Sequence, residues 1–468
     1  MPLPNARLST LSLHTDDLPH STHPNHSVAP PLTSSSTYRT PHPQSALANA
    51  EQDFEEGKAD LQDPPLHIYS RYTDETRTRV EKVLSAITNG NALTYASGLS
   101  AAYASVLHYA PRVIARRGGY FGVHVSTEVY LRSHDVKIID LDDVYPQAER
   151  SKDEKRPWSG GLLVWVESPL NPTGESRDLK HYADKTHAAG GHMIVDSTFG
   201  PPGLQDPFKQ GADMVLHSAT KYLGGHSDVL AGVLSVKSKQ EWLALWHDRT
   251  YVGVPPGSLE SWLLLRSLRT LKVRVAQQSS TATELVRYLT TLVSPSHNAS
   301  HVILSSSAEA AQTSEGLQAD KEIRESGIVR RVWHGSLQPR QDKDELGRKV
   351  EGGQNFDPKE QMSGGWNPCF SIRLSEEKYA RYLPHATQYF IPATSLGGVE
   401  SLMEWRKAAE STEEPGLVRI SVGLEDINDL IEDVRDSLLA LSRGERLGDA
   451  KKEARADVGE LSMAVRDP

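Results

Sequence analysis

The stretch that most constrains the fold of this 468-residue chain is residues 192–236, where two short apolar runs each lead into residues capable of chemistry. The runs at 193–195 and 214–216 are followed at once by polar and turn residues, which is typical of buried strands in a parallel sheet. In open α/β sheets, ligands bind beyond the carboxyl ends of the strands. The pattern therefore predicts that Asp196 and Lys221, which follow these runs, lie together at a ligand-binding edge.

An acid and a lysine at such an edge favour one kind of cofactor chemistry. A lysine amine can form a Schiff base with an aldehyde, and pyridoxal phosphate also requires a carboxylate beside its pyridine nitrogen. The hydroxyls of Ser218 and Thr220 flank Lys221 and are suited to a phosphate ester. Taken alone, these residues leave a second interpretation open, because a lysine among Ser and Thr is more often a solvated loop lysine, and an Asp after a strand is often a turn former.

The surrounding motifs favour the first interpretation. The segment SATKYLGGHSDVLAG, preceded by DSTFGPP and GAD, resembles the trans-sulfuration (Cys/Met metabolism) family of pyridoxal-phosphate enzymes, which includes cystathionine γ-synthase, γ-lyase and β-lyase and methionine γ-lyase. The resemblance implies an α/β fold of the fold-type I class, with a mostly parallel sheet in a large domain and a smaller α/β C-terminal domain. It implies that Lys221 holds the cofactor and is the catalytic base, and that Asp196 keeps the pyridine nitrogen protonated. Thr198, Ser218 and Thr220 are then further cofactor-binding residues.

A β-α-β unit precedes this segment. An apolar strand at 162–166, a helix at 179–189 and the strand before Asp196 predict a parallel sheet from the pattern itself. The turn after the first strand, ESPLNPTG, resembles the family's Glu-Thr-Pro-x-Asn-Pro motif. By that resemblance, Asn171 hydrogen-bonds the phenolic oxygen of the cofactor and also contacts the substrate.

Two stretches nearer the N-terminus resemble other cofactor-binding motifs. Ser-Gly-Leu at 97–99 opens an alanine-rich helix, whose first N–H groups are suited to an anion. A plain N-cap is the commoner explanation of such a sequence, but the family's matching motif holds the cofactor phosphate, which makes Gly98 and Leu99 backbone donors. The sequence at 119–122 lies where the family has Tyr-Gly-Gly-Thr, so Tyr120 matches the tyrosine that stacks on the cofactor ring and assists proton transfer. The alternative is a buried tyrosine at a strand edge.

Residues 1–72 are interpreted as a partly disordered N-terminal arm, because residues 1–63 are poor in apolar residues and rich in Ser, Thr, His and Pro. Within the arm, IYSRY at 68–72 resembles the family's Tyr-Ser-Arg motif, whose Tyr and Arg contact the cofactor phosphate of a neighbouring subunit. The resemblance gives Tyr69 and Arg71 this role and implies a homodimer or homotetramer with shared sites. An ordinary surface Tyr and Arg are the alternative interpretation.

The C-terminal half carries the expected substrate-binding residues. TSLGGVESL at 394–402 and LVRISVGLED at 417–426 resemble the family's C-terminal motifs. The guanidinium of Arg419 suits an α-carboxylate, and the matching arginine of the family binds the substrate carboxylate with help from the serine that matches Ser395. A strand-edge arginine paired with a local Glu is the alternative. Two departures are a threonine where γ-synthases and γ-lyases often carry Glu before this serine, and MEWR at 403–406, where a His-Pro pair is expected.

The predicted organisation is an arm, a pyridoxal-phosphate-binding domain, a C-terminal domain and a charged tail, at 1–72, 73–260, 261–442 and 443–468. A long amphipathic helix is predicted to begin at Ser258, because apolar residues recur there every three or four positions. Polar stretches near 294–327 and 336–365 are interpreted as surface insertions.

Composition excludes several other classes of protein. A net charge of −10 argues against nucleic acid as a main partner, and the single cysteine, Cys369, excludes an internal disulfide and a cysteine-rich zinc module. No apolar run is long enough to span a membrane, and the N-terminus lacks the pattern of a secretory signal, so a cytoplasmic protein is expected. Histidines and acids crowd the region around Asp196, but no familiar metal-ligand spacing occurs, so no metal site is predicted.

The expected function is elimination or replacement at Cγ of a sulfur amino acid or an activated homoserine ester, as in cystathionine γ-synthase or γ-lyase. A carbon–sulfur lyase of the cystathionine β-lyase or methionine γ-lyase type is the alternative. From another class, a protein that binds pyridoxal phosphate but has lost turnover and acts in regulation also stays open, because several motif contexts are altered.

Overall fold

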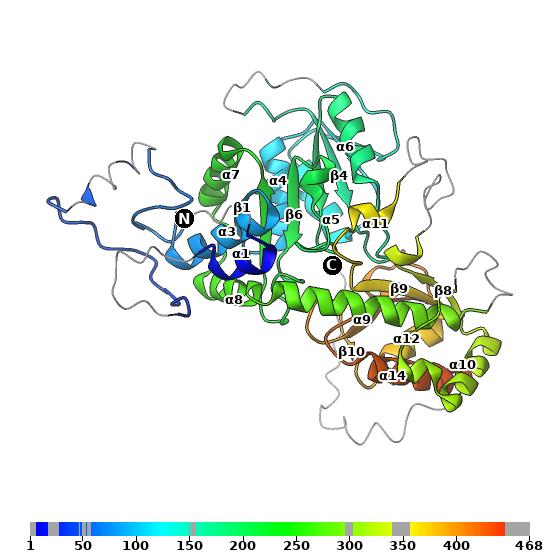
Figure 1. The fold of residues 1–468 in the computed structure, drawn as a ribbon. Coiled ribbons are helices and arrows are strands. Elements are labelled where there is room, and N and C mark those ends of the chain that lie inside the picture. The colour runs from blue at the N-terminus through cyan, green and yellow to red at the C-terminus, as the bar shows by residue number, and fades with distance from the viewer. Residues whose placement is uncertain are drawn as a thin grey trace, which may run out of the picture.

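The computed structural model describes residues 6–16, 28–45, 47–48, 53, 58–148, 151, 156–294, 303–338 and 356–444. They form a large domain and a smaller C-terminal domain, joined by a long helix (Figure 1). After α1 (Leu8–His14), the large domain consists of α3 (Glu75–Thr88), β1 (Asn91–Tyr95), α4 (Gly98–Tyr109), β2 (Val113–Arg116), α5 (Phe121–Leu131), β3 (Lys137–Ile139), β4 (Leu162–Glu167), α6 (Leu179–Ala188), β5 (His192–Asp196), η1 (Pro207–Gln210), β6 (Met214–Ser218), β7 (Gly232–Val236), α7 (Lys239–Val252) and α8 (Ser258–Leu268). The rest consists of α9 (Leu271–Thr291), η2 (Glu309–Gln312), α10 (Ser314–Ser326), β8 (Val329–Trp333), η3 (Gly335–Leu337), α11 (Pro358–Gln361), β9 (Cys369–Leu374), α12 (Glu377–Ala386), β10 (Ile391–Pro392), β11 (Leu402–Trp405), α13 (Arg406–Ala409), β12 (Leu417–Ser421) and α14 (Ile427–Ser442).

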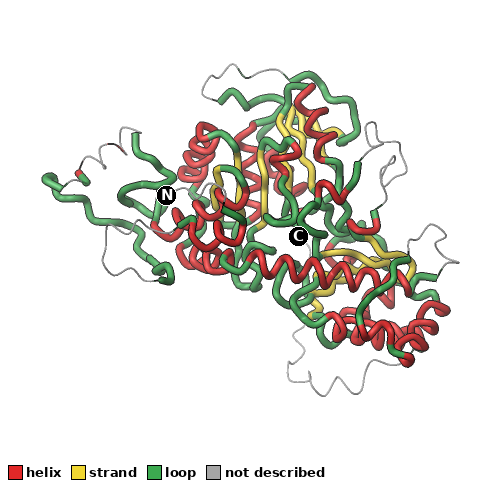
Figure 2. Tube along the Cα trace, in the orientation of Figure 1, coloured by secondary structure: helices red, strands yellow, loops and turns green. Residues whose placement is uncertain are grey.

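The central sheet of the large domain has seven strands among the described residues, in the order β1-β7-β6-β5-β4-β2-β3. Neighbours from β6 to β3 pair in parallel, and β7 is antiparallel to both of its neighbours. Because side chains alternate along a strand, Ile194 of β5 packs in the core with α4 and α7, whereas Met193 and Val195 pack in the core with α6. Helices therefore cover both faces of the sheet (Figure 2), which confirms the predicted α/β class.

The three strands predicted from the sequence bring candidate site residues to one edge of the sheet. The two apolar runs are β5 and β6, and the strand expected at 162–166 is β4, which confirms all three. The last residues of these parallel strands are Glu167, Asp196 and Ser218. Since the strands run in the same direction, their carboxyl ends bring these three residues to one edge of the sheet.

The helix predicted from Ser258 is two helices, so the prediction of one long helix is wrong. Helix α8 ends at Leu268, and Thr270 leaves helical geometry with φ −109° and ψ 3°. The Arg274 guanidinium stabilises the break, because it donates to the carbonyl of Ser267 (3.0 Å) near the end of α8 and to that of Tyr222 (2.9 Å) in the large domain.

Helix α9 belongs to both domains. Leu271 and Val275, in its first half, pack with α3 and α8, whereas Ala282 and Leu285 pack in the core of the C-terminal domain. By packing, the change of domain falls inside α9, beyond the boundary at 260 that the sequence suggested. The sequence did not indicate this boundary, because bulky apolar residues occur along both halves of the buried face of α9.

The C-terminal domain is built on a five-stranded sheet in the order β10-β11-β12-β9-β8. Strand β12 lies at its centre, antiparallel to β11 and β9, and the register of β11 and β12 sets Glu404 directly opposite Arg419. Neighbours across two strands have side chains on the same face of the sheet. The arginine expected to bind substrate thus has an acid as its immediate cross-strand neighbour.

Part of the predicted insertion at 294–327 is an integral part of the C-terminal domain, which corrects the expectation of a surface loop there. It contains α10, whose Asp320 is buried and accepts hydrogen bonds from the Tyr288 hydroxyl (2.6 Å) and from Nε of Arg435 (2.9 Å). The segment is polar because one face of this helix is exposed, and this composition led to the interpretation as a surface insertion. In the second predicted insertion, residues 339–355 lie outside the described residues, as does the tail beyond 444.

Residues 6–16 of the N-terminal arm include α1, which packs on the large domain. Asp16, just after α1, is buried and pairs with Arg79 (2.9 Å) and Arg269 (2.7 Å), which holds α1 on the large domain. Residues 28–45 run outward from that domain (Figure 1), but the Pro30 carbonyl near their start accepts from Nε1 of Trp262 in α8 (2.8 Å). Much of the segment predicted to be disordered, including residues 17–27, lies outside the part of the chain that the structure describes.

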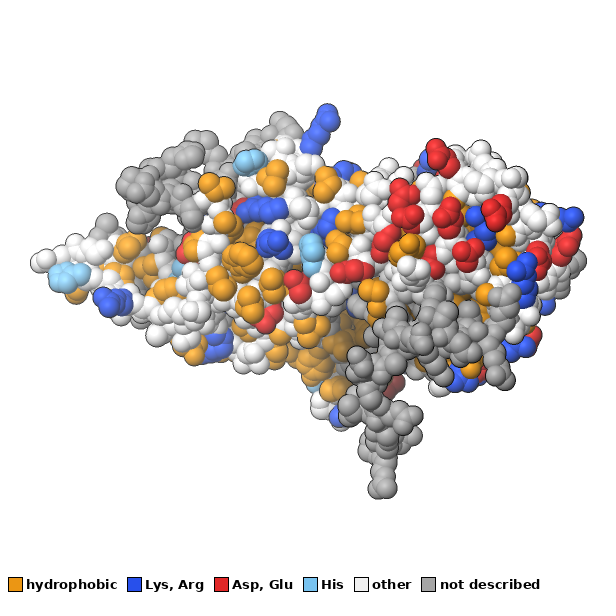
Figure 3. All heavy atoms as spheres, turned by 90° about the horizontal axis from the view of Figure 1, so that it is seen from below, with side chains coloured by type: hydrophobic (Ala, Val, Ile, Leu, Met, Phe, Trp, Pro, Cys, Tyr) orange, Lys and Arg blue, Asp and Glu red, His pale blue; other side chains and the backbone are white. Residues whose placement is uncertain are grey.

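Charge is unevenly distributed over the surface. Seen from below, acidic side chains gather over the C-terminal domain, whereas hydrophobic side chains gather towards the opposite half (Figure 3). Exposed apolar residues of α7, α8 and α9 include Tyr251, Val252, Leu259 and Val273. An acidic half does not favour a polyanionic partner, and clustered exposed apolar side chains are typical of interaction surfaces.

The Asp320 network predicts that the C-terminal domain is sensitive to one carboxylate. Asp320→Ala leaves the Arg435 guanidinium without its buried partner and is expected to lower the free energy of unfolding by about 3 to 5 kcal/mol. Glu322→Ala, which removes the exposed partner of Arg443 on the same helix, serves as the control and should change stability little. Urea unfolding of both variants measures the difference, and equal stabilities would contradict the account.

Candidate active site

A cavity of about 910 Å³ lies at the carboxyl edge of the large sheet, between the two domains. From the large domain it is lined by Gly98, Leu99, Tyr120, Asn171, Asp196, Thr198, Ser218, Thr220 and Lys221, and from the C-terminal domain by Ser395, Glu404, Arg406 and Arg419. The structure therefore brings together every site residue expected from the sequence except Tyr69 and Arg71.

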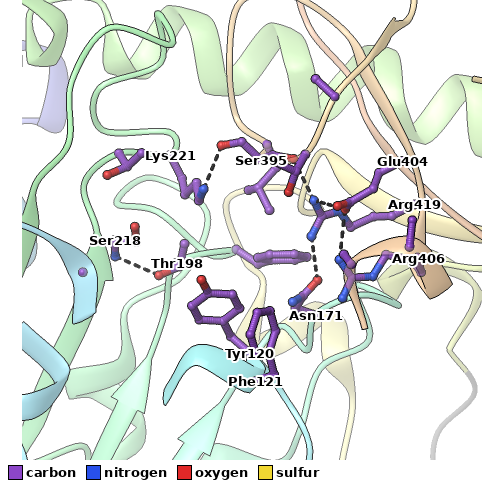
Figure 4. Close-up of a pocket in the computed structure, with 18 of the residues that line it drawn as sticks. Tyr120, Phe121, Asn171, Thr198, Ser218, Lys221, Ser395, Glu404, Arg406 and Arg419 are labelled. Atoms are coloured by element: carbon purple, nitrogen blue, oxygen red, sulfur yellow. Dashed lines mark hydrogen bonds and ion pairs between the residues drawn. The ribbon is translucent and has the colours of Figure 1, made fainter. Parts of the chain in front are cut away.

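Lys221 follows β6 and points into the cavity, where Nζ donates to Oγ of Ser395 at 2.7 Å (Figure 4). Burial and, to a lesser extent, the nearby positive charge of Arg419 lower the pKa of Lys221 from 10.5 to about 8, while Glu404 opposes the change. A lysine with this pKa is partly neutral close to neutral pH, and only the neutral amine is a nucleophile or a base.

Ser395 joins the lysine to the expected carboxylate site. Its backbone carbonyl accepts a hydrogen bond from Nη2 of Arg419 (2.8 Å), while its side chain accepts from Lys221. Its φ is +85°, a conformation that non-glycine residues rarely adopt. Backbone strain of this kind persists where surrounding contacts hold it and is concentrated at functional sites.

Asp196 is a buried acid held by its neighbours. Its Oδ1 accepts from the backbone N–H (3.0 Å) and hydroxyl (2.6 Å) of Thr198, and the Thr198 hydroxyl in turn accepts from the N–H of Ser218 (2.9 Å). Burial raises the pKa of the Asp196 carboxyl. Asp196 forms no ion pair with any described lysine, arginine or histidine. A buried acid without a cation is stabilised when a cationic ligand atom arrives.

Glu167, at the end of β4, positions two of the predicted residues. Its carboxylate oxygens accept from the backbone N–H groups of Tyr120 and Asn171, both at 2.7 Å. Burial, together with the negative charge of Asp196, raises the pKa of Glu167. The sequence motif contained this glutamate, but its role as a link between two strand exits depends on the fold.

The N-terminus of α4 also lines the cavity. Ser97 caps the helix by accepting from the N–H of Ser100 (3.0 Å). The N–H groups of Gly98 and Leu99 are in the first turn, where backbone N–H groups have no acceptor within the helix. A Cβ atom at position 98 would come within 2.9 Å of the Ser218 hydroxyl, so glycine allows the close approach. Backbone donors and hydroxyls thus converge as an anion would require.

Tyr120 is the N-cap residue of α5 and is 41% exposed towards the cavity, so the alternative of a buried strand-edge tyrosine is wrong. In Figure 4 its ring lies below Lys221, beside Phe121. An exposed ring on the wall of a cavity is available to stack on a planar ligand.

Arg419 carries more partners than expected. Nη1 donates to Oδ1 of Asn171 (3.0 Å), and Nη2 lies 2.6 Å from Oε2 of Glu404. Arg406 approaches the same glutamate oxygen at 2.9 Å. The arginine therefore lines the cavity and is also paired with a local Glu, so features of both interpretations occur together. The motif comparison gave no role to Glu404 or Arg406, because a His-Pro pair was expected in this region.

Tyr69 and Arg71 lie apart from the cavity of their own chain. Arg71 packs on the rings of Tyr69 and Tyr72 and donates to the carbonyl of Thr250 (3.4 Å). Their predicted role in a neighbouring site stays a prediction. Within the described ranges, no cluster of three or more potential metal ligands occurs, and no helix is long and apolar enough to cross a membrane.

Comparison with known proteins decides the family. The model of the Cys/Met metabolism PLP-dependent enzymes matches residues 9–314 and 351–439. The chain belongs to this family. It is 30% identical over 431 residues to cystathionine γ-lyase of Saccharomyces cerevisiae, covering 88% of this chain and 93% of that protein. It is 30% identical to cystathionine γ-synthase of Escherichia coli, covering 82% and 90% respectively. The solved structure of CalE6, a methionine γ-lyase from Micromonospora echinospora, superposes with a TM-score of 0.69 at 27% identity, covering 92% and 99%.

The chain is thus a pyridoxal-phosphate-dependent enzyme of sulfur amino-acid metabolism. The cavity fits that cofactor, because it offers a buried acid without a cation, a helix N-terminus beside hydroxyls, and a buried amine of lowered pKa. The gap in the family match, 315–350, overlaps both stretches interpreted as insertions.

The lowered pKa of Lys221 predicts a pH-dependent cost in stability. Below about pH 8 the folded, cofactor-free protein buries a charged amine, and the cost declines as pH rises from about 8 towards 10.5, because only the unfolded lysine is then protonated. Lys221→Met should therefore stabilise the cofactor-free protein by about 2 kcal/mol at pH 7, and the gain should shrink by about 1 kcal/mol at pH 9.

Urea titrations at the two pH values measure this gain. Lys180→Met, which removes an exposed lysine, is the control and should give no pH-dependent change. A gain from Lys221→Met that is equal at pH 7 and pH 9 would show that burial does not lower the pKa of this amine.

Proposed function

We propose that this enzyme catalyses elimination or replacement at Cγ of a sulfur amino acid or an activated homoserine ester. The observation that carries the proposal is the convergence of Lys221, Asp196 and Arg419 in one cavity. These are the three groups that such a reaction needs: a base, an acid facing the cofactor ring and a carboxylate binder.

Pyridoxal phosphate, when bound, supplies an electron sink for the bonding pair at Cα. The Gly98 and Leu99 N–H groups, with Ser218 and Thr220, would hold its phosphate. Asp196, fixed by Thr198, would face its ring nitrogen, while Asn171 would contact its phenolic oxygen. The proposed assignments use side chains whose present contacts leave them facing the cavity.

The remaining residues would act on the amino acid. Arg419 and Ser395 would hold the α-carboxylate, which orients the Cα–H bond towards Lys221. The Lys221 amine would remove this proton, and its lowered pKa supports such a role because the neutral form is accessible near neutral pH. Tyr120 would stack over the cofactor ring and assist proton transfer to the leaving group. Glu167 would keep Tyr120 and Asn171 in position.

Two observations favour γ over β chemistry. The segments 395–402 and 419–426 are closest in pattern to γ-synthases and γ-lyases. Two relatives with 30% identity are named for γ reactions. Thr394 does not match the glutamate that γ-enzymes often carry, so β-elimination is the second candidate.

The products of cystathionine cleavage test this choice. Cleavage between sulfur and Cγ releases cysteine, ammonia and 2-oxobutanoate, whereas cleavage on the other side of the sulfur releases homocysteine, ammonia and pyruvate. We expect 2-oxobutanoate from the purified holoenzyme, or cystathionine and succinate when O-succinylhomoserine and cysteine are supplied. Lys221→Ala should lower kcat by at least about 10³-fold, because the base is lost.

Each other outcome has a definite meaning. Pyruvate as the keto acid would establish the β-lyase alternative. A protein that binds the cofactor, shown by its visible absorption band, but turns over none of these substrates would instead establish the regulatory alternative. A wild-type protein that takes up no cofactor would contradict the proposed function.

We infer further that two subunits share each site. Tyr69 and Arg71 lie outside the cavity of their own chain, and the guanidinium of Arg71 lies against aromatic rings without a carboxylate partner among the described residues. The exposed apolar side chains of α7 and α8 support a subunit contact. A dimer or a tetramer of paired dimers is proposed, and a cytoplasmic location stays a prediction.

Mixed dimers test the sharing. Lys221→Ala and Arg71→Ala are each expected to lose activity at limiting cofactor. In a mixed dimer, one site combines the intact Lys221 of one subunit with the intact Arg71 of the other, so about half of the wild-type activity should return. Co-expression with two affinity tags isolates this species. Mixed dimers as inactive as their parents would place both residues in the same site and overturn the inference.

A further inference from the structure

A carboxylate already occupies the guanidinium that is proposed to bind the substrate. Glu404 lies between Arg419 and Arg406, and its Oε2 is 2.6 Å from Nη2 of the first and 2.9 Å from Nη1 of the second (Figure 4). The three residues are 9%, 5% and 4% exposed, respectively. They line the same cavity, so the group is a built part of the site.

The hydrogen-bonding groups of Arg419 are largely occupied. Asn171 accepts from Nη1, while Nη2 donates to the Ser395 carbonyl and pairs with Glu404. An incoming α-carboxylate must therefore share this guanidinium with Glu404 or displace it. Two carboxylates on one buried cation repel each other strongly, because the interior screens charge poorly. Displacement of Glu404 relieves this repulsion at Arg419.

Arg406 is placed to receive the displaced carboxylate. It begins α13 directly after β11, so backbone structure on both sides fixes its position. Nη2 faces Glu413 (3.4 Å) and Glu410 (3.7 Å), whereas its buried Nε has no hydrogen-bond partner among the described residues. Since Nε and Nη2 share one edge of the guanidinium, this edge can bind a carboxylate through two donors, one of which is unused.

We propose that Glu404 is an exchangeable carboxylate that pairs with Arg419 in the empty site and moves fully onto Arg406 when the α-carboxylate of the substrate binds Arg419. The proposal rests on the proposed role of Arg419 in binding substrate. Glu404 and Arg406 thereby set the affinity of the site for amino acids. The departure at MEWR, where the family pattern predicts His-Pro, supplies the second arginine that the exchange needs.

The exchange makes opposite predictions for the two partners. Glu404→Gln removes the competing charge but keeps a hydrogen-bonding group, so substrate should bind more tightly. Arg406→Leu removes the group that receives the carboxylate, and a displaced Glu404 would then be buried and unpaired, so substrate should bind more weakly. In the double variant Glu404→Gln/Arg406→Leu, no displaced carboxylate has to pair with Arg406. The tighter binding of Glu404→Gln should therefore be retained.

Titration of the holoenzyme with L-norleucine tests this scheme. Norleucine has an α-carboxylate but no leaving group, and its binding is followed by the change in the absorption band of the bound cofactor. We expect Kd to fall about tenfold for Glu404→Gln, to rise about tenfold for Arg406→Leu, and to fall about tenfold for the double variant. Arg406→Lys keeps a cation and should stay nearer the wild-type Kd than Arg406→Leu.

Glu413→Gln is the matched control. It neutralises another acid that faces Arg406 but does not contact Arg419, and Kd should stay within about twofold of wild type. Melting temperatures of all variants establish that they are folded.

The possible failures are distinguishable. Weaker binding in Glu404→Gln would show that Glu404 only orients Arg419, and equal Kd values in all variants would show that no exchange occurs. Either result overturns the exchange and leaves the proposed function intact. A wild-type holoenzyme that does not bind norleucine would overturn both.

Discussion

The burial of the Lys221 amine beneath the C-terminal domain is the constraint on which the site depends. The lysine leaves the end of β6 and meets Ser395, which belongs to the other domain and adopts a strained φ of +85°. The same serine accepts from Arg419 through its carbonyl. Lys221, Ser395 and Arg419 are therefore one connected unit. The lowered pKa of the lysine depends on the two domains staying together, since burial is its largest cause.

The cavity holds its charges in two separate arrangements. On the sheet side, Asp196 and Glu167 are buried acids whose pKa values are raised by burial, and backbone or hydroxyl donors hold them rather than cations. On the other side, Glu404 already neutralises two arginines. The buried acids on the sheet side can pair with a cation, such as a protonated cofactor ring. On the other side, by the proposed exchange, Arg419 releases the Glu404 carboxylate before it binds the carboxylate of a substrate. Ligand binding thus completes one side and rearranges the other.

Much of the sheet and the centre of the site could be predicted from the sequence, because short apolar runs end at the residues that carry the chemistry. The order of parallel strands then places Asp196 and Lys221 together without further information. Features that depend on register or on packing were not predictable. Glu404 faces Arg419 only through the pairing of β11 and β12, and at the break between α8 and α9 Arg274 binds the carbonyl of Ser267. The proposed role of Tyr69 and Arg71 in a neighbouring site is not tested by one chain, in which neither residue lines the cavity.

The most direct test of the account is to identify the amine that holds the cofactor. Borohydride reduction of the holoenzyme fixes pyridoxal phosphate to that amine, and peptide mass spectrometry then locates the added mass. The account predicts that a single lysine carries the label and that it is Lys221, because its amine is buried, of lowered pKa, and lines the same cavity as Asp196. A label on another lysine, or an unlabelled Lys221 in a protein that has retained its cofactor, would contradict the central claim.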